Sequence, residues 1–200
     1  MQRRMLAAGA AALVALAGCG GGKESQDADE PEGNFPVEIV KASFPTKQRL
    51  ADQSQLEITV RNAGDRPVPN VAVTVQGDRT GSSASAAAFA EASEQQGLAD
   101  PSRPVWILDD GPRGGTTAYV NTWALGRIGV GQTKTFRWRV TAVKPGTHTV
   151  TYRVAAGLNG KAKAVLRGGR EPAGQFTVAI SGKPADARVG AGGEVIVSPR

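Results

Sequence analysis

The side chains that could support catalysis or bind a metal are few in this 200-residue chain, which has a single cysteine, Cys19, and a single histidine, His148. A catalytic triad needs a base to activate its nucleophile, and the usual base is histidine. His148 is in phase with the apolar residues Val150 and Tyr152, which predicts a position at the rim of a core. Zinc and copper sites need several His or Cys ligands. We therefore expect no enzyme activity, no metal and no cofactor.

Asp109 and Asp110 form a tight acidic pair that is followed by Gly111. Asp-Gly is common in turns, so we expect a turn after a buried strand. A calcium site that also uses Asp100 is the alternative, because hard cations favour carboxylates on loops. The glycine-rich segment 111–117 lacks the lysine and the following helix of a phosphate-binding P-loop, and we expect a plain loop there.

The N-terminal segment has the pattern of an export signal. Arg3 and Arg4 precede an apolar run at 5–17. That run of about 13 residues is shorter than the roughly 20 that cross a bilayer as a helix. The motif Leu16-Ala17-Gly18-Cys19 resembles the lipobox of bacterial lipoproteins. The resemblance implies a signal peptide at 1–18, a diacylglycerol on Cys19, and attachment to the extracytoplasmic face of the membrane. A plain secretory signal with an incidental, unpaired cysteine is the alternative.

Residues 19–35 are predicted to form a flexible acidic tether, because they lack apolar periodicity and are rich in Gly, Pro and acidic residues. The whole chain has 24 Lys and Arg against 18 Asp and Glu. The tether carries a net charge of −4 and the chain from Gly33 onward +8. A basic domain on an acidic tether suits an anionic envelope surface, although the charge could serve solubility alone.

From Pro36 the sequence alternates apolar and polar residues with a period of two, the pattern of half-buried strands. Many short strands separated by Gly and Pro turns favour an all-β sandwich or barrel. We place one domain at 36–182 and a C-terminal tail at 183–200, with room for one extra strand. The predicted strands are centred on 56–60, 71–75, 136–140, 150–154 and 176–180, with weaker ones at 37–44, 105–108, 118–125 and 163–166.

A family resemblance lies in the segment from Leu56 to Val75, which contains Asn62-Ala-Gly64-Asp65. It resembles the opening strands of bacterial cell-surface Ig-like repeats, namely CARDB-type and conserved-repeat domains. Residues 123–136 resemble the next turn of these repeats, and 144–150 the following hairpin. The resemblance covers most of residues 50–155. It implies an Ig-like antiparallel β-sandwich with a binding or spacing role.

The chain departs from that family by a long insertion at 78–103. Its centre, 84–96, is rich in Ala, Glu and Gln, with Phe89 as the single large apolar residue. A short surface helix that docks Phe89 on the sandwich is one interpretation, and a disordered loop is the other. A long insertion in a compact domain is a candidate for function in either case.

Basic side chains provide the candidate binding surface. Arg137, Arg139 and Arg153 lie on two strands predicted to form a hairpin, and they should point away from the core together. Such a stripe could bind carboxylate or phosphate polymers of the envelope, and a solvated sheet face is the alternative. An exported protein is not expected to meet nucleic acid. The three tryptophans are expected in the core rather than in a sugar site, and they are Trp106, Trp123 and Trp138.

These observations predict a lipid-anchored extracytoplasmic module with a non-catalytic binding or spacing role at the cell envelope. Its partners would be the membrane, through the lipid, and an envelope protein or an anionic wall polymer. The alternative is an accessory lipoprotein of an envelope transporter or wall-synthesis complex, which would contact its partner through the insertion at 78–103. A hydrolase with an unrecognised site is a third hypothesis.

Overall fold

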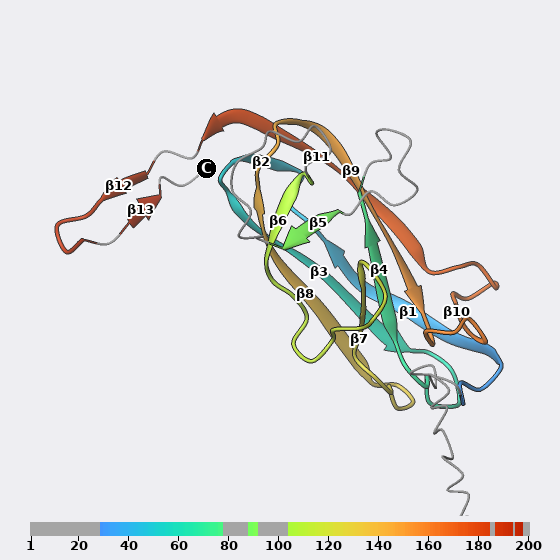
Figure 1. The fold of residues 1–200 in the computed structure, drawn as a ribbon. Coiled ribbons are helices and arrows are strands. Elements are labelled where there is room, and N and C mark those ends of the chain that lie inside the picture. Colours follow the sequence, from blue (N-terminus) through green and yellow to red (C-terminus); the bar gives the residue numbers. More distant parts are fainter. Residues whose placement is uncertain (1–28, 78–87, 92–103, 185–186, 194, 198–200) are drawn as a thin grey trace, which may run out of the picture.

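The fold consists of two facing β-sheets, shown by a computed structural model that describes residues 29–77, 88–91, 104–184, 187–193 and 195–197 (Figure 1). The first sheet has six strands, in the order β10 (Ala162–Val165), β1 (Gly33–Ser43), β3 (Gln53–Asn62), β8 (Thr133–Ala142), β6 (Trp106–Asp110) and β5 (Phe89–Glu91). The second has five, in the order β2 (Lys47–Leu50), β11 (Ala173–Pro184), β9 (Gly146–Ala155), β4 (Ala72–Gln76) and β7 (Thr122–Ala124). No helix occurs in the described ranges.

The core fills the space between the two sheets, and the period-two pattern predicts it well. Leu56, Ile58 and Val60 of β3 are fully buried, as are Phe136 and Trp138 of β8. Successive side chains of a strand point to opposite faces, so each alternating segment supplies one apolar face. The predicted all-β sandwich is therefore confirmed.

The tryptophans pack in the core, as predicted. Trp138 meets Trp123 edge-on, with ring centroids 5.4 Å apart, and stacks on Phe136 at 5.9 Å. Trp106 is fully buried and lies 5.5 Å from the ring of Phe44. Trp123 is only partly buried, because its short strand β7 lies at the edge of the second sheet.

The predicted hairpin between 136–140 and 150–154 is wrong. β8 pairs with β3 and β6 in the first sheet, whereas β9 pairs with β4 and β11 in the second. Residues 143–145 between them therefore cross from one sheet to the other. A short turn with Pro and Gly is typical of a hairpin, but it also suits a tight crossover at the end of a sandwich.

The interior strand pairs are antiparallel, as expected, but three edge pairs are parallel. These are β1 with β10, β2 with β11, and β5 with β6. β10 reaches its place beside β1 after the chain has left β9 in the opposite sheet. An edge strand that arrives by such a crossover can enter in either direction.

The insertion at 78–103 contains strand β5, so the predicted helix is wrong at Phe89–Glu91. Phe89 docks on the sandwich as expected, because it is buried and its ring lies 6.3 Å from Trp123. The rest of the insertion lies outside the described residues.

The C-terminal region has two short strands where one was predicted. β11 continues to Pro184, and β12 (Ala187–Val189) then pairs with β13 (Val195–Val197) in a separate antiparallel hairpin. This hairpin projects from the body at the end of the molecule opposite the start of β1 (Figure 1).

A buried polar contact holds the edge strand β2 against the core. The Trp106 indole N–H donates to Gln48 Oε1 at 2.8 Å, and Gln48 Nε2 donates to the Pro45 carbonyl at 3.0 Å. Both side chains are buried, so the indole N–H has no access to water that could replace the amide oxygen.

We expect Gln48→Met to lower the free energy of unfolding by about 1–3 kcal/mol, because it leaves a buried indole donor unsatisfied while keeping the side chain's volume. Denaturant unfolding followed by tryptophan fluorescence measures the change. Gln175→Met, on an exposed position of β11, should change stability by less than about 0.5 kcal/mol. Equal effects of the two substitutions would contradict the role of this hydrogen bond.

Candidate functional site

The predicted arginine stripe does not assemble. Arg137 and Arg139 lie on β8 in the first sheet, whereas Arg153 lies on β9 in the second. The outer faces of these sheets point in opposite directions, so the three guanidinium groups share no surface. Each arginine also faces a carboxylate. Arg137 pairs with Glu57 at 3.3 Å, Arg139 lies 3.8 Å from Asp110, and Arg153 pairs with Glu171 at 2.9 Å.

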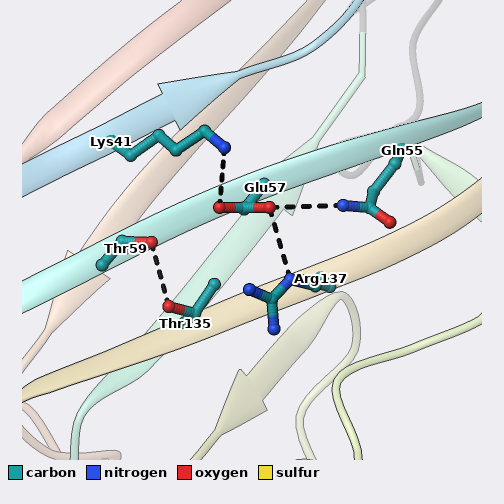
Figure 2. A network of polar contacts seen from close by, with 6 residues as sticks. All are labelled: Lys41, Gln55, Glu57, Thr59, Thr135 and Arg137. Carbon is teal, nitrogen blue, oxygen red and sulfur yellow. Dashed lines mark hydrogen bonds and ion pairs between the residues drawn. The ribbon is translucent and has the colours of Figure 1, made fainter.

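Glu57 is the centre of a polar network on the outer face of the first sheet (Figure 2). Its carboxylate accepts from Lys41 Nζ at 3.0 Å, from Arg137 Nε at 3.3 Å and from Gln55 Nε2 at 3.2 Å. Glu57 is only 9% exposed, because the longer side chains around it cover its carboxylate. The network ties β1, β3 and β8 together, which makes Arg137 a structural residue.

The hydrogen bond from Lys41 lowers the pKa of Glu57 below its ordinary value of 4.5, and Arg137 adds to this effect against the opposing influence of burial. A lowered pKa in the folded state stabilises the fold above pH 4.5, and this contribution is lost as the pH falls through the folded-state pKa. Glu57→Gln removes this titrating carboxylate. We therefore expect the free energy of unfolding to fall less in the variant than in the wild type between neutral pH and pH values below 4.5.

Urea unfolding at a series of pH values measures this difference. Glu38→Gln is the matched control, because Glu38 forms an ion pair with Arg61 on the same face but is half exposed. The control should follow the wild-type pH profile closely. A wild-type profile for Glu57→Gln would contradict the effect of the network on stability.

The other residues considered as catalytic or metal-binding candidates make structural contacts. His148 lies at the rim of the core, as predicted, with its ring 6.1 Å from Trp106 and Nε2 3.2 Å from the Pro145 carbonyl. Asp109 and Asp110 belong to the end of β6, so the predicted turn is wrong at these two positions. Asp109 Oδ2 accepts from Gln53 at 3.1 Å and from Thr141 at 2.8 Å.

No metal centre emerges from the described part of the chain, where no group of three or more His, Cys, Asp and Glu side chains could hold an ion. Asp100, the third residue of the calcium hypothesis, lies outside the described residues. The same is true of Cys19 and of the lipobox residues Leu16, Ala17 and Gly18.

The end of the sandwich where β1 begins, which we call the basal end, gathers several loops. Gly33 pairs with Ala162, and the end of β3 pairs with the start of β8. Asn62 joins the loops that follow β3 and precede β8. Its Nδ2 donates to the carbonyls of Arg66 at 2.9 Å and Ile128 at 3.1 Å. Asn62 is buried, so these bonds fix the two loops side by side.

Glu30 fastens the start of the described chain to the basal end. Its carboxylate accepts a hydrogen bond from the Asn159 amide at 2.7 Å and another from the Ala162 amide. Glu30 is 7% exposed and lies against Gly157, where a Cβ atom would collide with the carboxyl group. The predicted tether boundary at 35 is therefore too late, because Glu30 is bonded to the folded domain and β1 begins at Gly33.

We expect Glu30→Ala to lower the free energy of unfolding by about 2–3 kcal/mol, because two charge-assisted hydrogen bonds are lost and the buried Ala162 amide loses its acceptor. Gly157→Ala should act in the same direction by displacing the Glu30 carboxylate. Chemical denaturation gives the stability, and amide hydrogen exchange at Asn159 and Ala162 gives the local effect.

The control for this clamp is Glu32→Ala, because Glu32 is an exposed acidic residue two positions away. It should leave both stability and exchange close to wild type. Unchanged exchange at Asn159 and Ala162 in Glu30→Ala would show that the carboxylate does not hold this loop.

A groove of about 1040 Å³ opens at the basal end, between the outer face of β1 and β3 and the turn that follows β10. Arg61, Arg167 and Arg170 line it together with Glu38, which pairs with Arg61. No carboxylate in the described part of the chain pairs with Arg167 or Arg170. We call this feature the basal groove.

The turn at 166–170 positions the two arginines. The Leu166 amide donates to the Arg170 carbonyl at 2.8 Å, and Gly168 and Gly169 have φ angles of 91° and 80°. Only glycine adopts this left-handed backbone without cost, so the Gly-Gly pair allows the tight turn that sets an arginine on either side. Guanidinium groups bind phosphate and carboxylate through paired N–H donors, so the groove can bind anions.

The sequence prediction missed this site. Arg167-Gly-Gly-Arg170 was a usable signal, because two arginines flank a pair that favours a turn. The basal groove replaces the predicted stripe as the candidate binding surface.

The two facing sheets place this chain in the class of Ig-like β-sandwich domains. No family model matches the sequence. No curated protein is similar to it at a significant level.

Among solved structures, the chain is similar to a CARDB domain of the PF1109 protein from Pyrococcus furiosus, solved in complex with di-metal ions. The identity is 16%, the TM-score is 0.41, and the match covers 74% of this chain and 87% of that one. A further match is alpha-2-macroglobulin from Escherichia coli, with 15% identity, a TM-score of 0.44, and coverage of 76% of this chain and 17% of that one.

A third match is a β-glucosidase from Listeria innocua, with 18% identity, a TM-score of 0.38, and coverage of 75% of this chain and 16% of that one. The chain thus spans less than a fifth of the length of the last two proteins. Similarities of this size concern the fold alone. Within the residues described here, no helical segment could span a lipid bilayer.

Proposed function

We propose that this protein is a lipid-anchored, extracytoplasmic Ig-like module with a non-catalytic binding or spacing role at the cell envelope. The lipid is carried by the Cys19 sulfur, after removal of residues 1–18. The β-sandwich supplies a rigid body, and the candidate catalytic and metal-binding residues His148 and Asp109 make structural contacts within it.

The lipobox-like motif Leu16-Ala17-Gly18-Cys19 is the observation that carries this proposal, and the Glu30 clamp follows it closely in sequence. Residues 20–29 separate the two, and an extended chain spans at most about 3.3–3.6 Å per residue, or about 40 Å in all. The clamp supports the proposal, because it joins the chain that follows Cys19 to the basal end. A lipid on Cys19 would therefore hold this end near the membrane and leave the β12–β13 hairpin pointing away from it.

Lipidation predicts that the mature protein begins at Cys19 and that its N-terminal peptide carries a diacylglycerol, which mass spectrometry of the membrane fraction detects. A thioether-linked lipid with two or three acyl chains gives lasting attachment, because each buried methylene contributes about 0.8 kcal/mol. Cys19→Ser should abolish the modification and release the processed protein or leave its precursor uncleaved.

The matched control is Ser25→Cys in the Cys19→Ser background, which keeps one thiol near the N-terminus but outside the lipobox. It should remain unmodified. An unmodified Cys19 in the mature wild-type protein, or wild-type protein released freely into the medium, would overturn the proposal.

A further inference from the structure

We propose that the basal end is a docking surface for anionic phospholipid headgroups, with Arg167 and Arg170 of the basal groove as its main contacts. This inference rests on the proposed function for its biological setting, since the anchor brings the basal end to the membrane. The binding itself depends on the surface of the folded domain and can be measured without the lipid.

The position of the surface is the first argument. Glu30 and Gly33 tie the start of the described chain to Asn159 and Ala162 at the basal end. The basal groove lies at the same end, because its lining includes Pro36 and Val37 of β1. A membrane anchor upstream of Glu30 therefore faces this end of the sandwich rather than the opposite one.

The charge of the basal end is the second argument. Five basic residues lie there besides Arg61, and the exposed acidic residues beside them are Asp29, Glu32 and Asp65, since Glu30 is buried, Glu38 pairs with Arg61 and Glu171 pairs with Arg153. Arg66 lies over the Phe35 ring at 4.1 Å and donates to the Asn34 carbonyl at 3.0 Å, which leaves its charge uncompensated by either contact. The five residues are Arg66, Arg127, Lys163, Arg167 and Arg170.

An exposed apolar side chain at the same end is the third argument. Val130 is 53% exposed and lines the basal groove together with Arg167 and Arg170. Basic groups with an apolar residue between them suit the boundary of headgroups and acyl chains, where phosphates meet the cations and the apolar group leaves water. A soluble polyanion would use the arginines but would gain nothing from Val130.

The test uses the full chain with Cys19→Ser, so that no thioether lipid contributes, and measures cosedimentation with vesicles. Vesicles of phosphatidylcholine with phosphatidylglycerol should bind the protein more strongly than vesicles of phosphatidylcholine alone, and salt should weaken the binding. Each basic residue near an anionic surface strengthens binding about fivefold, so Arg167→Glu with Arg170→Glu should weaken binding at least about twentyfold.

The control is Lys47→Glu with Lys183→Glu, the same change of charge on exposed residues of β2 and β11. These positions belong to the end opposite β1's start, so binding should stay near wild type. Residues 1–18, where retained, are the same in every variant, and differences between variants therefore report the surface of the domain. Circular dichroism and thermal unfolding should show that both double variants keep the fold.

Three outcomes would overturn the inference. The first is that the Arg167/Arg170 variant binds vesicles as well as the Cys19→Ser parent does. The second is that the Lys47/Lys183 variant weakens binding as much as the Arg167/Arg170 variant. The third is that the parent binds soluble polyglycerol phosphate but does not bind vesicles. The last result would assign the groove to an anionic polymer instead. Failure here leaves the mass spectrometry of Cys19 unaffected, so the docking surface and the lipid anchor are tested separately.

Discussion

The double pairing of β3 is the constraint on which the rest of the structure depends. β3 pairs with β8 on one side over nearly its whole length, and with β1 on the other side through residues 57–62. Because register decides which side chains face inward, this pairing sends Leu56 and Ile58 into the core and brings Glu57 to Lys41 and Arg137 on the outer face. The same register ends β3 at Asn62, whose side chain then holds the basal loops together.

The sequence predicted where most strands lie but not which strands are neighbours. A period of two depends only on one face being buried, so it is visible locally in 56–60, 136–140 and 150–154. Pairing depends on contacts between distant residues, and nothing in the alternation of β8 and β9 shows that they belong to opposite sheets. The predicted arginine stripe assumed that β8 and β9 pair with each other, which the sequence alone does not show.

The basal end was hidden from sequence reasoning for a different reason. Glu30 sits in a segment whose composition favours disorder, yet its carboxylate accepts hydrogen bonds from the backbone amides of Asn159 and Ala162. Composition reports the average tendency of a segment, and it cannot show that one carboxylate within the segment is buried and accepts hydrogen bonds. Arg167 and Arg170 were visible as residues, but their freedom from carboxylate partners in the described part of the chain follows only from the tertiary structure.

The parallel pairing of β1 with β10 has a consequence for the order in which the chain can fold. Residues near the beginning of the sequence find their partners more than a hundred positions later, at Asn159–Val165. Because β3 is close to β1 in sequence, β1 can pair early with β3, but its other edge is covered only when β10, far along the chain, joins it. Until then, one side of the first sheet remains open to pairing with other chains, and closing it is a late step of folding.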